Sequence, residues 1–388
     1  MRRAYLDNNA TTPLLPEVFE AMQPYFIEQF GNASSIHSHG QRTRGAIEQS
    51  RASVAELLGA REAEVVFTSG GTEADNLALF GIAQPGDHII TSTIEHSAVL
   101  NTSRRLEEMG CEVSCVPVDS EARINPDDVR RAIKPNTKLI TIMAANNETG
   151  VVQDVAAIGQ VAAEADIYFH TDAVQAAGKI PINVDEWHCD LLSISGHKIH
   201  APQGTGALYV RKGTQLRPQL YGGRHERMRR AGTENVPGIV GLGKAAELAH
   251  KGFTDGSVQR IAGFRDRIQQ FVLANCDQVG VNSVNARRVP NTTNIYFDCI
   301  EGEALVIALD LKGVAVSTGA ACSSGAIEPS HVLISMGMNR DRARGCIRFS
   351  LGKQNTADDV DQLLSVLPET VARLRQLSPV YNKKAAVG

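Results

Sequence analysis

The segment Asp190-Leu-Leu-Ser-Ile-Ser-Gly-His-Lys198 is an apolar run that ends in an imidazole and an amine. A second apolar run, Ile167-Tyr-Phe-His-Thr-Asp172, lies upstream and ends in a carboxylate. Each run has the length and composition of a short buried strand with a reactive group at its carboxyl end. In open α/β sheets, ligands bind at that edge. A lysine and an aspartate there suit pyridoxal phosphate, because the lysine can form a Schiff base and the acid can pair with the pyridinium nitrogen.

Strand-like and helix-like segments alternate along the chain from about residue 60 to residue 250. Further strands are predicted at residues 64–68, 88–92, 138–143 and 207–210. Helices are predicted at residues 72–83, 97–109 and 155–164. This order predicts a mostly parallel, doubly wound sheet between two layers of helices.

A polar, glycine-containing stretch at residues 251–257 predicts a domain boundary. Beyond it, the patterns predict helices at 258–275, 302–311 and 357–377, and strands at 293–298 and 346–350. We therefore expect a large domain of residues 13–257, and a smaller α+β domain formed by residues 1–12 and 258–388.

The composition is that of an ordinary soluble globular protein, with 388 residues, 43% hydrophobic residues, 21% charged residues and a formal net charge of −4. The chain has no excess of basic residues that would indicate a nucleic-acid partner. It also has no apolar stretch of about 18 residues that would indicate a membrane span. The seven cysteines include no CxxC pair, and the N-terminus has no signal-peptide pattern, so we expect a cytoplasmic protein with reduced thiols. His37 and His39 lack further ligands nearby, so we expect no metal site.

The motif Thr68-Ser-Gly-Gly-Thr72 joins a predicted strand to a predicted helix. Glycines let the backbone approach a ligand closely, and the free amides of a helix start favour a phosphate, which makes Gly71 and Thr72 candidates. The alternative is a common Gly-Gly turn before a helix cap. Ser195 and His197, beside Lys198, can donate further hydrogen bonds to a phosphate.

Two other loops follow predicted strands. His96 can stack on a planar ring and move protons, or it can equally cap a helix. Asn147, in the turn Asn146-Asn-Glu-Thr-Gly150, is either a ligand-binding residue at the same sheet edge or part of a plain loop.

The stretch Ser317-Thr-Gly-Ala-Ala-Cys-Ser-Ser-Gly325 places Cys322 among small residues, which favours a reactive thiol over a buried structural one. Arg348, in a predicted strand, can bind a carboxylate with two parallel hydrogen bonds or can be a surface charge. The remaining cysteines are interpreted as structural: Cys111, Cys115, Cys189, Cys276, Cys299 and Cys346.

Taken together, these motifs resemble the cysteine desulfurases of the NifS/IscS type, which are fold-type I pyridoxal-phosphate enzymes of the class V aminotransferase family. The resemblance runs almost end to end. Its motifs are Tyr5–Thr12, Gly31–Ser35, Thr68–Thr72, Glu95-His96, Asn146–Gly150, Asp172–Gln175, Ser195–Lys198, Arg230–Asn235, the cysteine loop at about 318–330 and Ile347–Ser350.

The resemblance implies a set of roles around the cofactor. Lys198 would hold pyridoxal phosphate and later move the Cα proton of the substrate. Asp172 would keep the ring nitrogen protonated, Gln175 would bond the phenolic oxygen, and His96 would stack on the ring and relay protons. The residues implied to hold the phosphate are Gly71, Thr72, Ser195, His197 and, from the neighbouring subunit of a homodimer, Thr233.

The resemblance also implies the substrate and the reaction. Arg348, Asn147 and Asn32 would fix the carboxylate of L-cysteine. Cys322 would attack the substrate sulfur, leaving an enzyme persulfide and releasing L-alanine. The sulfur would then pass to an iron–sulfur scaffold or another acceptor protein.

Two alternatives use the same residues differently. One is a selenocysteine lyase or an aminotransferase of the same fold; an aminotransferase has no use for a reactive thiol at position 322. The other is a non-catalytic sulfur-relay protein, in which a cofactor-binding lysine and aspartate would be unnecessary.

Overall fold

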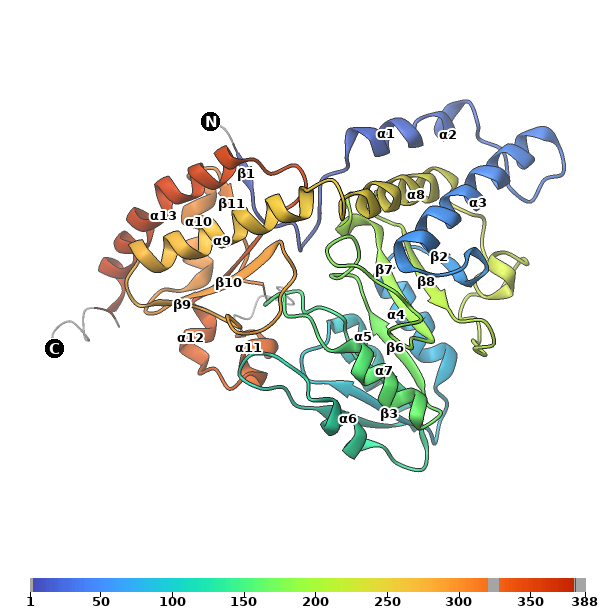
Figure 1. Ribbon diagram of the computed structural model, residues 1–388, viewed down its shortest axis with the longest axis horizontal. Helices are drawn as coiled ribbons and strands as arrows, with labels where there is room; N and C mark the ends of the chain where they lie inside the picture. The colour runs from blue at the N-terminus through green and yellow to red at the C-terminus, as the bar shows by residue number, and fades with distance from the viewer. Residues whose placement is uncertain (1–2, 320–327, 380, 382–388) are drawn as a thin grey trace.

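A seven-stranded sheet forms the centre of the computed structural model, which describes residues 3–319, 328–379 and 381 (Figure 1). In spatial order its strands are β2 (Val65–Thr68), β8 (Gly206–Val210), β7 (Leu191–Ser195), β6 (Tyr168–Asp172), β5 (Thr137–Thr141), β3 (His88–Ser92) and β4 (Glu112–Val116). Neighbouring strands from β7 to β4 pair in parallel, whereas β8 runs antiparallel to both β7 and β2. The predicted mostly parallel sheet is confirmed, with β8 as its one reversed strand among the described residues.

Alternate residues of the strands contribute to two hydrophobic clusters, one on each face of the sheet. Val66, Leu191 and Leu208 pack with α4 (Gly71–Ile82) and α5 (Ser97–Glu108). Their sequence neighbours pack on the opposite face with α3 (Ser38–Leu58), α7 (Val155–Glu164) and α8 (Val236–Lys251). Helices therefore cover both faces, which explains why strands such as β2, β7 and β8 are buried along their whole length.

The remaining helices of this part of the chain are short: α1 (Pro16–Met22), α2 (Pro24–Ile27) and α6 (Pro126–Ala132). The long helices α3 and α8 and the edge strand β4 were not predicted from the sequence. None of the helices in the described ranges is long and apolar enough to cross a membrane.

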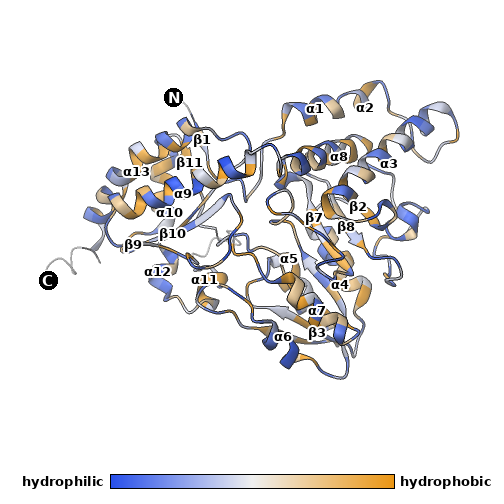
Figure 2. Cartoon of the chain, in the orientation of Figure 1, coloured by the Kyte–Doolittle hydropathy of each residue, from blue (hydrophilic) through white to orange (hydrophobic). Residues whose placement is uncertain are grey.

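The C-terminal residues form a separate antiparallel sheet of β12 (Cys346–Ser350), β10 (Thr292–Phe297) and β9 (Val279–Val281). The first strand of the chain, β1 (Ala4–Tyr5), pairs in parallel with β11 (Val314–Ala315), so it lies among the C-terminal elements (Figure 1). The helices here are α9 (Ser257–Asn275), α10 (Gly302–Asp310), α11 (His331–Ser335), α12 (Arg340–Arg344) and α13 (Ala357–Leu377). The two longest, α9 and α13, alternate hydrophilic and hydrophobic residues along their length (Figure 2).

These C-terminal elements share a core of their own, which includes Leu6, Phe297, Phe349 and Leu363. The domain limits at residues 12/13 and 257/258 stay a prediction. What matters for the site is that the carboxyl ends of β2, β3, β5, β6 and β7 meet at one edge of the large sheet, facing this second core.

Candidate active site

A cavity of about 640 Å³ lies at the carboxyl edge of the large sheet. It is lined by ten of the residues singled out in the sequence: Gly71, Thr72, His96, Asn147, Asp172, Gln175, Ser195, His197, Lys198 and Arg348. The cavity thus brings together loops that follow five strands of the large sheet and one strand, β12, of the smaller sheet.

Two other candidates do not line this cavity, and a third lies outside the described residues. Asn32 is exposed before α3, where its Oδ1 accepts a hydrogen bond from the Ser34 N–H at 2.8 Å. Thr233 is exposed on the loop before α8. Cys322 lies outside the described residues, but Ser317 and Gly319 on its N-terminal side line the cavity. The six described cysteines are free thiols and none of them lines it; Cys115 is exposed on β4.

Lys198 ends a short 3-10 turn that directly follows β7. Its Nζ donates hydrogen bonds to the backbone oxygens of Asn9 at 2.6 Å and Ala10 at 2.7 Å. Burial, and then the charge of Arg348, lowers the pKa of Lys198 to about 8. A larger share of the amine is therefore neutral at physiological pH than for an exposed lysine, which suits a nucleophile or a base.

Two buried carboxyl groups sit beside each other in the cavity wall. Asp172 ends β6 and accepts a hydrogen bond from the Val174 N–H at 2.9 Å. Burial raises the pKa of Asp172, while the charges of His96 and Lys198 lower it. Burial and the charge of Asp172 raise the pKa of Asp75 well above its usual range. Asp75 therefore keeps the proton and Asp172 ionises first.

His170 lies behind this carboxyl pair, with 3.6 Å between its Nε2 and Asp75 Oδ1. Burial lowers the pKa of His170 to about 3, so the ring is neutral and offers Asp75 no charge. Its nitrogens are taken by the hydroxyls of Ser193 and Thr141, at 2.9 and 2.8 Å. No sequence pattern singles out Asp75, because an acid in the first turns of a helix is commonplace.

The start of α4 supplies backbone amides to the cavity. Gly70 provides no capping side chain, and no acceptor in the described structure takes the N–H groups of Gly71 and Thr72. A Cβ on Gly71 would lie 2.8 Å from Val174 Cγ2, so this position leaves little room for a side chain. Burial lowers the pKa of His197 to about 4, so the imidazole is neutral, and its Nδ1 lies 3.1 Å from Thr11 Oγ1. Free helix amides beside a neutral donor fit a phosphate.

His96 caps a helix, as one interpretation of the sequence expected, and it also faces the cavity, as the other requires. Its Nδ1 accepts a hydrogen bond from the Ala98 N–H at 3.1 Å and so caps α5, while the ring lines the cavity. Because Nδ1 is an acceptor, the neutral ring carries its proton on Nε2.

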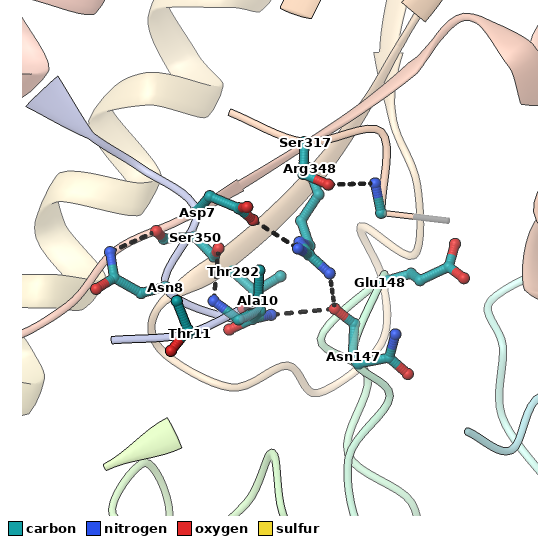
Figure 3. Close-up of polar contacts among 12 residues, drawn as sticks. Asp7, Asn8, Ala10, Thr11, Asn147, Glu148, Thr292, Ser317, Arg348 and Ser350 are labelled. Atoms are coloured by element: carbon teal, nitrogen blue, oxygen red, sulfur yellow. Dashed lines mark hydrogen bonds and ion pairs between the residues drawn. The ribbon is translucent and has the colours of Figure 1, made fainter. Parts of the chain in front are cut away.

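Arg348 lies on β12 with only 4% of its side chain exposed. Its Nη2 donates to Asp7 Oδ1 at 2.6 Å and its Nη1 to the Asn147 oxygen at 2.9 Å, whereas its Nε has no partner in the described structure (Figure 3). The guanidinium is thus held by the N-terminal segment and the loop after β5. Asp7 was not predicted as part of the site.

Asn9 connects the two sheets at the cavity. Its backbone N–H donates to Ser350 Oγ at 3.0 Å, and its Nδ2 donates to Thr292 Oγ1 at 2.8 Å and to the Asn147 oxygen at 3.1 Å. Its own backbone oxygen accepts from Lys198. The only sequence signal was that Asn9 belongs to the motif Tyr5–Thr12, which suggested no specific role.

The chain matches the Aminotransferase class-V family over residues 4–363. Cysteine desulfurase IscS of Dictyoglomus turgidum is 48% identical over 393 residues, covering 99% of this chain and 100% of the relative. The IscS of Methanosarcina thermophila is 49% identical over 387 residues, covering 99% and 95%. A solved NifS-like protein superposes with a TM-score of 0.89 at 36% identity, covering 96% of this chain and all of that one. SspA, solved in complex with cysteine, has a TM-score of 0.80 at 37% identity, covering 91% and 100%.

The matches span nearly the whole chain, and they confirm the resemblance drawn from the motifs. The protein belongs to the class-V aminotransferase family, among its cysteine desulfurases of the IscS and NifS type.

Proposed function

We propose that the protein is a cysteine desulfurase that uses pyridoxal phosphate to remove sulfur from L-cysteine, giving L-alanine and a persulfide on Cys322. The observation that carries this proposal is one cavity that holds an amine, a buried carboxylate and a buried guanidinium: Lys198, Asp172 and Arg348. Gly319, close in sequence to Cys322, lines the same cavity.

The residues present fit pyridoxal phosphate, the cofactor of this enzyme family. Lys198 has a lowered pKa and faces the cavity, and Asp172 is the carboxyl that ionises first. The uncapped amides of Gly71 and Thr72 suit the phosphate, with Ser195 and His197 in the same wall. When bound, the cofactor would supply an electron sink for charge that develops at the substrate's Cα and Cβ.

The protein's own groups would bind the substrate and move protons. Arg348, with Asn147, would hold the substrate carboxylate. Asn32, expected to join them, does not line the cavity of its own chain. The Lys198 amine would move the proton at Cα. His96 would relay a proton from Nε2, because its Nδ1 is engaged in capping α5.

Cys322 would act on the substrate sulfur. Its thiolate would form an S–S bond as the C–S bond breaks, and the electrons of that bond would stay with carbon, which a proton converts to alanine. The persulfide would pass to an iron–sulfur scaffold or another acceptor protein. Six further thiols are all unpaired, which supports a reducing compartment such as the cytoplasm.

A homodimer would complete the site, with Thr233 reaching the phosphate held by the partner. Supporting this, Thr233 is exposed, and apolar side chains around α1–α3 are exposed in the single chain, among them Phe19 (52%), Phe30 (70%) and Ile36 (91%). Exposed apolar side chains that gather on one surface often mark an interface with a partner.

The test compares Cys322→Ala with Cys115→Ala, a matched change at an exposed thiol. Purified protein should be yellow and release sulfide from L-cysteine in the presence of a thiol reductant. We expect Cys322→Ala to keep the colour and lose sulfide release, and Cys115→Ala to match the wild type. Sulfide release by Cys322→Ala at the native rate would overturn the persulfide step, and a colourless wild type would overturn the cofactor assignment.

A further inference from the structure

Lys179 is a buried lysine for which the proposed reaction has no use. It lies four residues after Gln175, in the turns between β6 and β7, and is only 9% exposed. Its Nζ lies 2.5 Å from Gln175 Oε1 and 3.2 Å from Asn9 Oδ1. In the parts of the chain that are described, no carboxylate comes within ion-pair distance of it.

The surroundings of Lys179 explain why it depends on these two amide oxygens. It lines a second, smaller cavity of about 70 Å³ together with Lys198, His200 and Lys353. The charges of Lys198 and Arg348 act against its own positive charge. Burying an amine is costly unless its protons are donated. Whether charged or neutral, Lys179 has protons for both acceptors.

Gln175 is held at both ends of its amide. Its Nε2 lies 3.0 Å from the backbone oxygen of Asn9, which can only accept a hydrogen bond, so this end must be the NH₂ group. The carbonyl end then faces Lys179. Lys179 fixes the oxygen and Asn9 fixes the nitrogen, so the amide cannot turn over without losing two buried hydrogen bonds.

Gln175 lines the large cavity, and Lys179 lies behind it on the side of the small cavity. Asn9 accounts for one of the two Nε2 protons, and the second is left for a ligand. We propose that Lys179 is a positioning residue that keeps Gln175 as a fixed hydrogen-bond donor to the phenolic oxygen of the bound cofactor. This inference rests on the proposed function.

A fixed donor would stabilise the negative charge on that oxygen, and this favours loss of the proton from the linkage between the cofactor and Lys198. Without Lys179 the amide can present its oxygen instead, and the linkage should hold its proton to higher pH. The predicted readout is therefore the pH at which the visible absorbance band of the loaded enzyme changes, which does not depend on turnover.

The experiment compares Lys179→Met with the wild type across the neutral and alkaline range. We expect the midpoint of the absorbance change to rise by about one pH unit, the size of one lost hydrogen bond to a charged group. Lys179→Arg keeps a donor and should recover part of the shift. Lys353→Met removes another lysine of the same small cavity, one whose Nζ contacts the Leu248 oxygen rather than Gln175, and should titrate like the wild type.

A double variant tests the route through Gln175. In a Gln175→Leu background, Lys179→Met should cause no further shift, because its target is gone. Should Lys179→Met not fold, Gln175→Glu keeps the bond to Lys179 but removes the donor, and should raise the midpoint in the same way. An unchanged midpoint in folded Lys179→Met or in Gln175→Glu, or an equal shift in the Gln175→Leu background, would overturn the inference. If the wild type itself showed no visible band, the proposed function would fail instead.

Discussion

Arg348 and Asp7 form an ion pair in the wall of the cavity, with 2.6 Å between Nη2 and Oδ1. The backbone oxygen of Asn147 accepts a hydrogen bond from the other terminal nitrogen, Nη1, so the plane of the guanidinium is set before any substrate arrives. A substrate carboxylate must therefore share this guanidinium with Asp7.

Replacing the planar group with a point charge should weaken substrate binding. In Arg348→Lys a single ammonium cannot satisfy Asp7 and the Asn147 oxygen while also presenting two donors to a carboxylate. We expect the KM for L-cysteine to rise about tenfold to a hundredfold, as for the loss of one charge-assisted hydrogen bond. Steady-state kinetics measure this. Arg340→Lys, at an exposed pair with Glu328, is the control and should leave KM unchanged.

The rate of cofactor loading should depend on pH through Lys198. Only the neutral amine attacks an aldehyde, and the pKa of Lys198 is lowered to about 8. Mixing apoenzyme with pyridoxal phosphate and following the visible band should give a rate that climbs about tenfold per pH unit below that value and levels off above it.

Two variants give opposite shifts of this midpoint. Arg348 lowers the pKa of Lys198, so Arg348→Met should move the midpoint up; Asp7 raises that pKa, so Asp7→Asn should move it down. Shifts of the same sign in both variants would contradict the electrostatic explanation.

The two neighbouring carboxyl groups should respond differently to the same substitution. Asp75 keeps its proton because its pKa is raised well above its usual range, so an amide in Asp75→Asn resembles the native group. Asp172→Asn instead removes the charge expected to pair with the ring nitrogen. We expect the first variant to bind cofactor nearly as the wild type does and to keep activity within about tenfold, and the second to lose about a hundredfold or more in kcat. Equal losses in both variants would show that Asp75 carries the charge.

A buried ion pair should stabilise the loop that carries Thr233. Arg51 donates to both carboxylate oxygens of Glu226, at 2.7 and 3.0 Å, and both side chains are buried. Glu226 begins three successive non-glycine residues with positive φ, of 42°, 54° and 64°, a backbone conformation that needs external support. Glu226→Gln should lower the free energy of unfolding by about 3 to 5 kcal/mol.

The control for this prediction is Glu108→Gln, which removes the acid of an exposed pair with Arg105 and should cost less than about 1 kcal/mol. Urea unfolding of both variants provides the measurement. If the two substitutions cost the same, the buried pair does not hold the loop.

Local sequence patterns predicted most strands of the large sheet. Strands such as β3 and β7 are buried at every position and begin or continue with a pair of large apolar residues, so composition alone located them and the reactive groups that follow them. The helix α8 was not predicted from the sequence, because Gly238, Gly241 and Gly243 weaken the helical pattern. In the folded protein these glycines allow α8 to pack closely on α3. A Cβ on Gly243, for example, would lie 2.6 Å from Ser50 Cα on α3.

The predicted residues that line the cavity lie at or shortly after the ends of strands, except Arg348, which lies within β12. Asp172 ends β6 and Lys198 ends the turn after β7, and the fold brings them together. Asp7 and Asn9 were not predicted, because the partners that hold them at the site lie 138 to 341 positions away and no local spacing links Asp7 to Arg348. Asp75 depends on burial beside Asp172, which appears only once α4 packs on the sheet.

The place of the N-terminal segment beside β12 constrains how this chain is made on the ribosome. Asp7 and Arg348 are separated by 341 positions, so one wall of the pocket joins two segments that are translated at widely separated times. The large sheet can collapse while synthesis continues, since its strands end at Val210. Residues 7–9 cannot pair with β12 until that strand has been made, so the pocket around the Lys198 amine stays open on that side until late in synthesis.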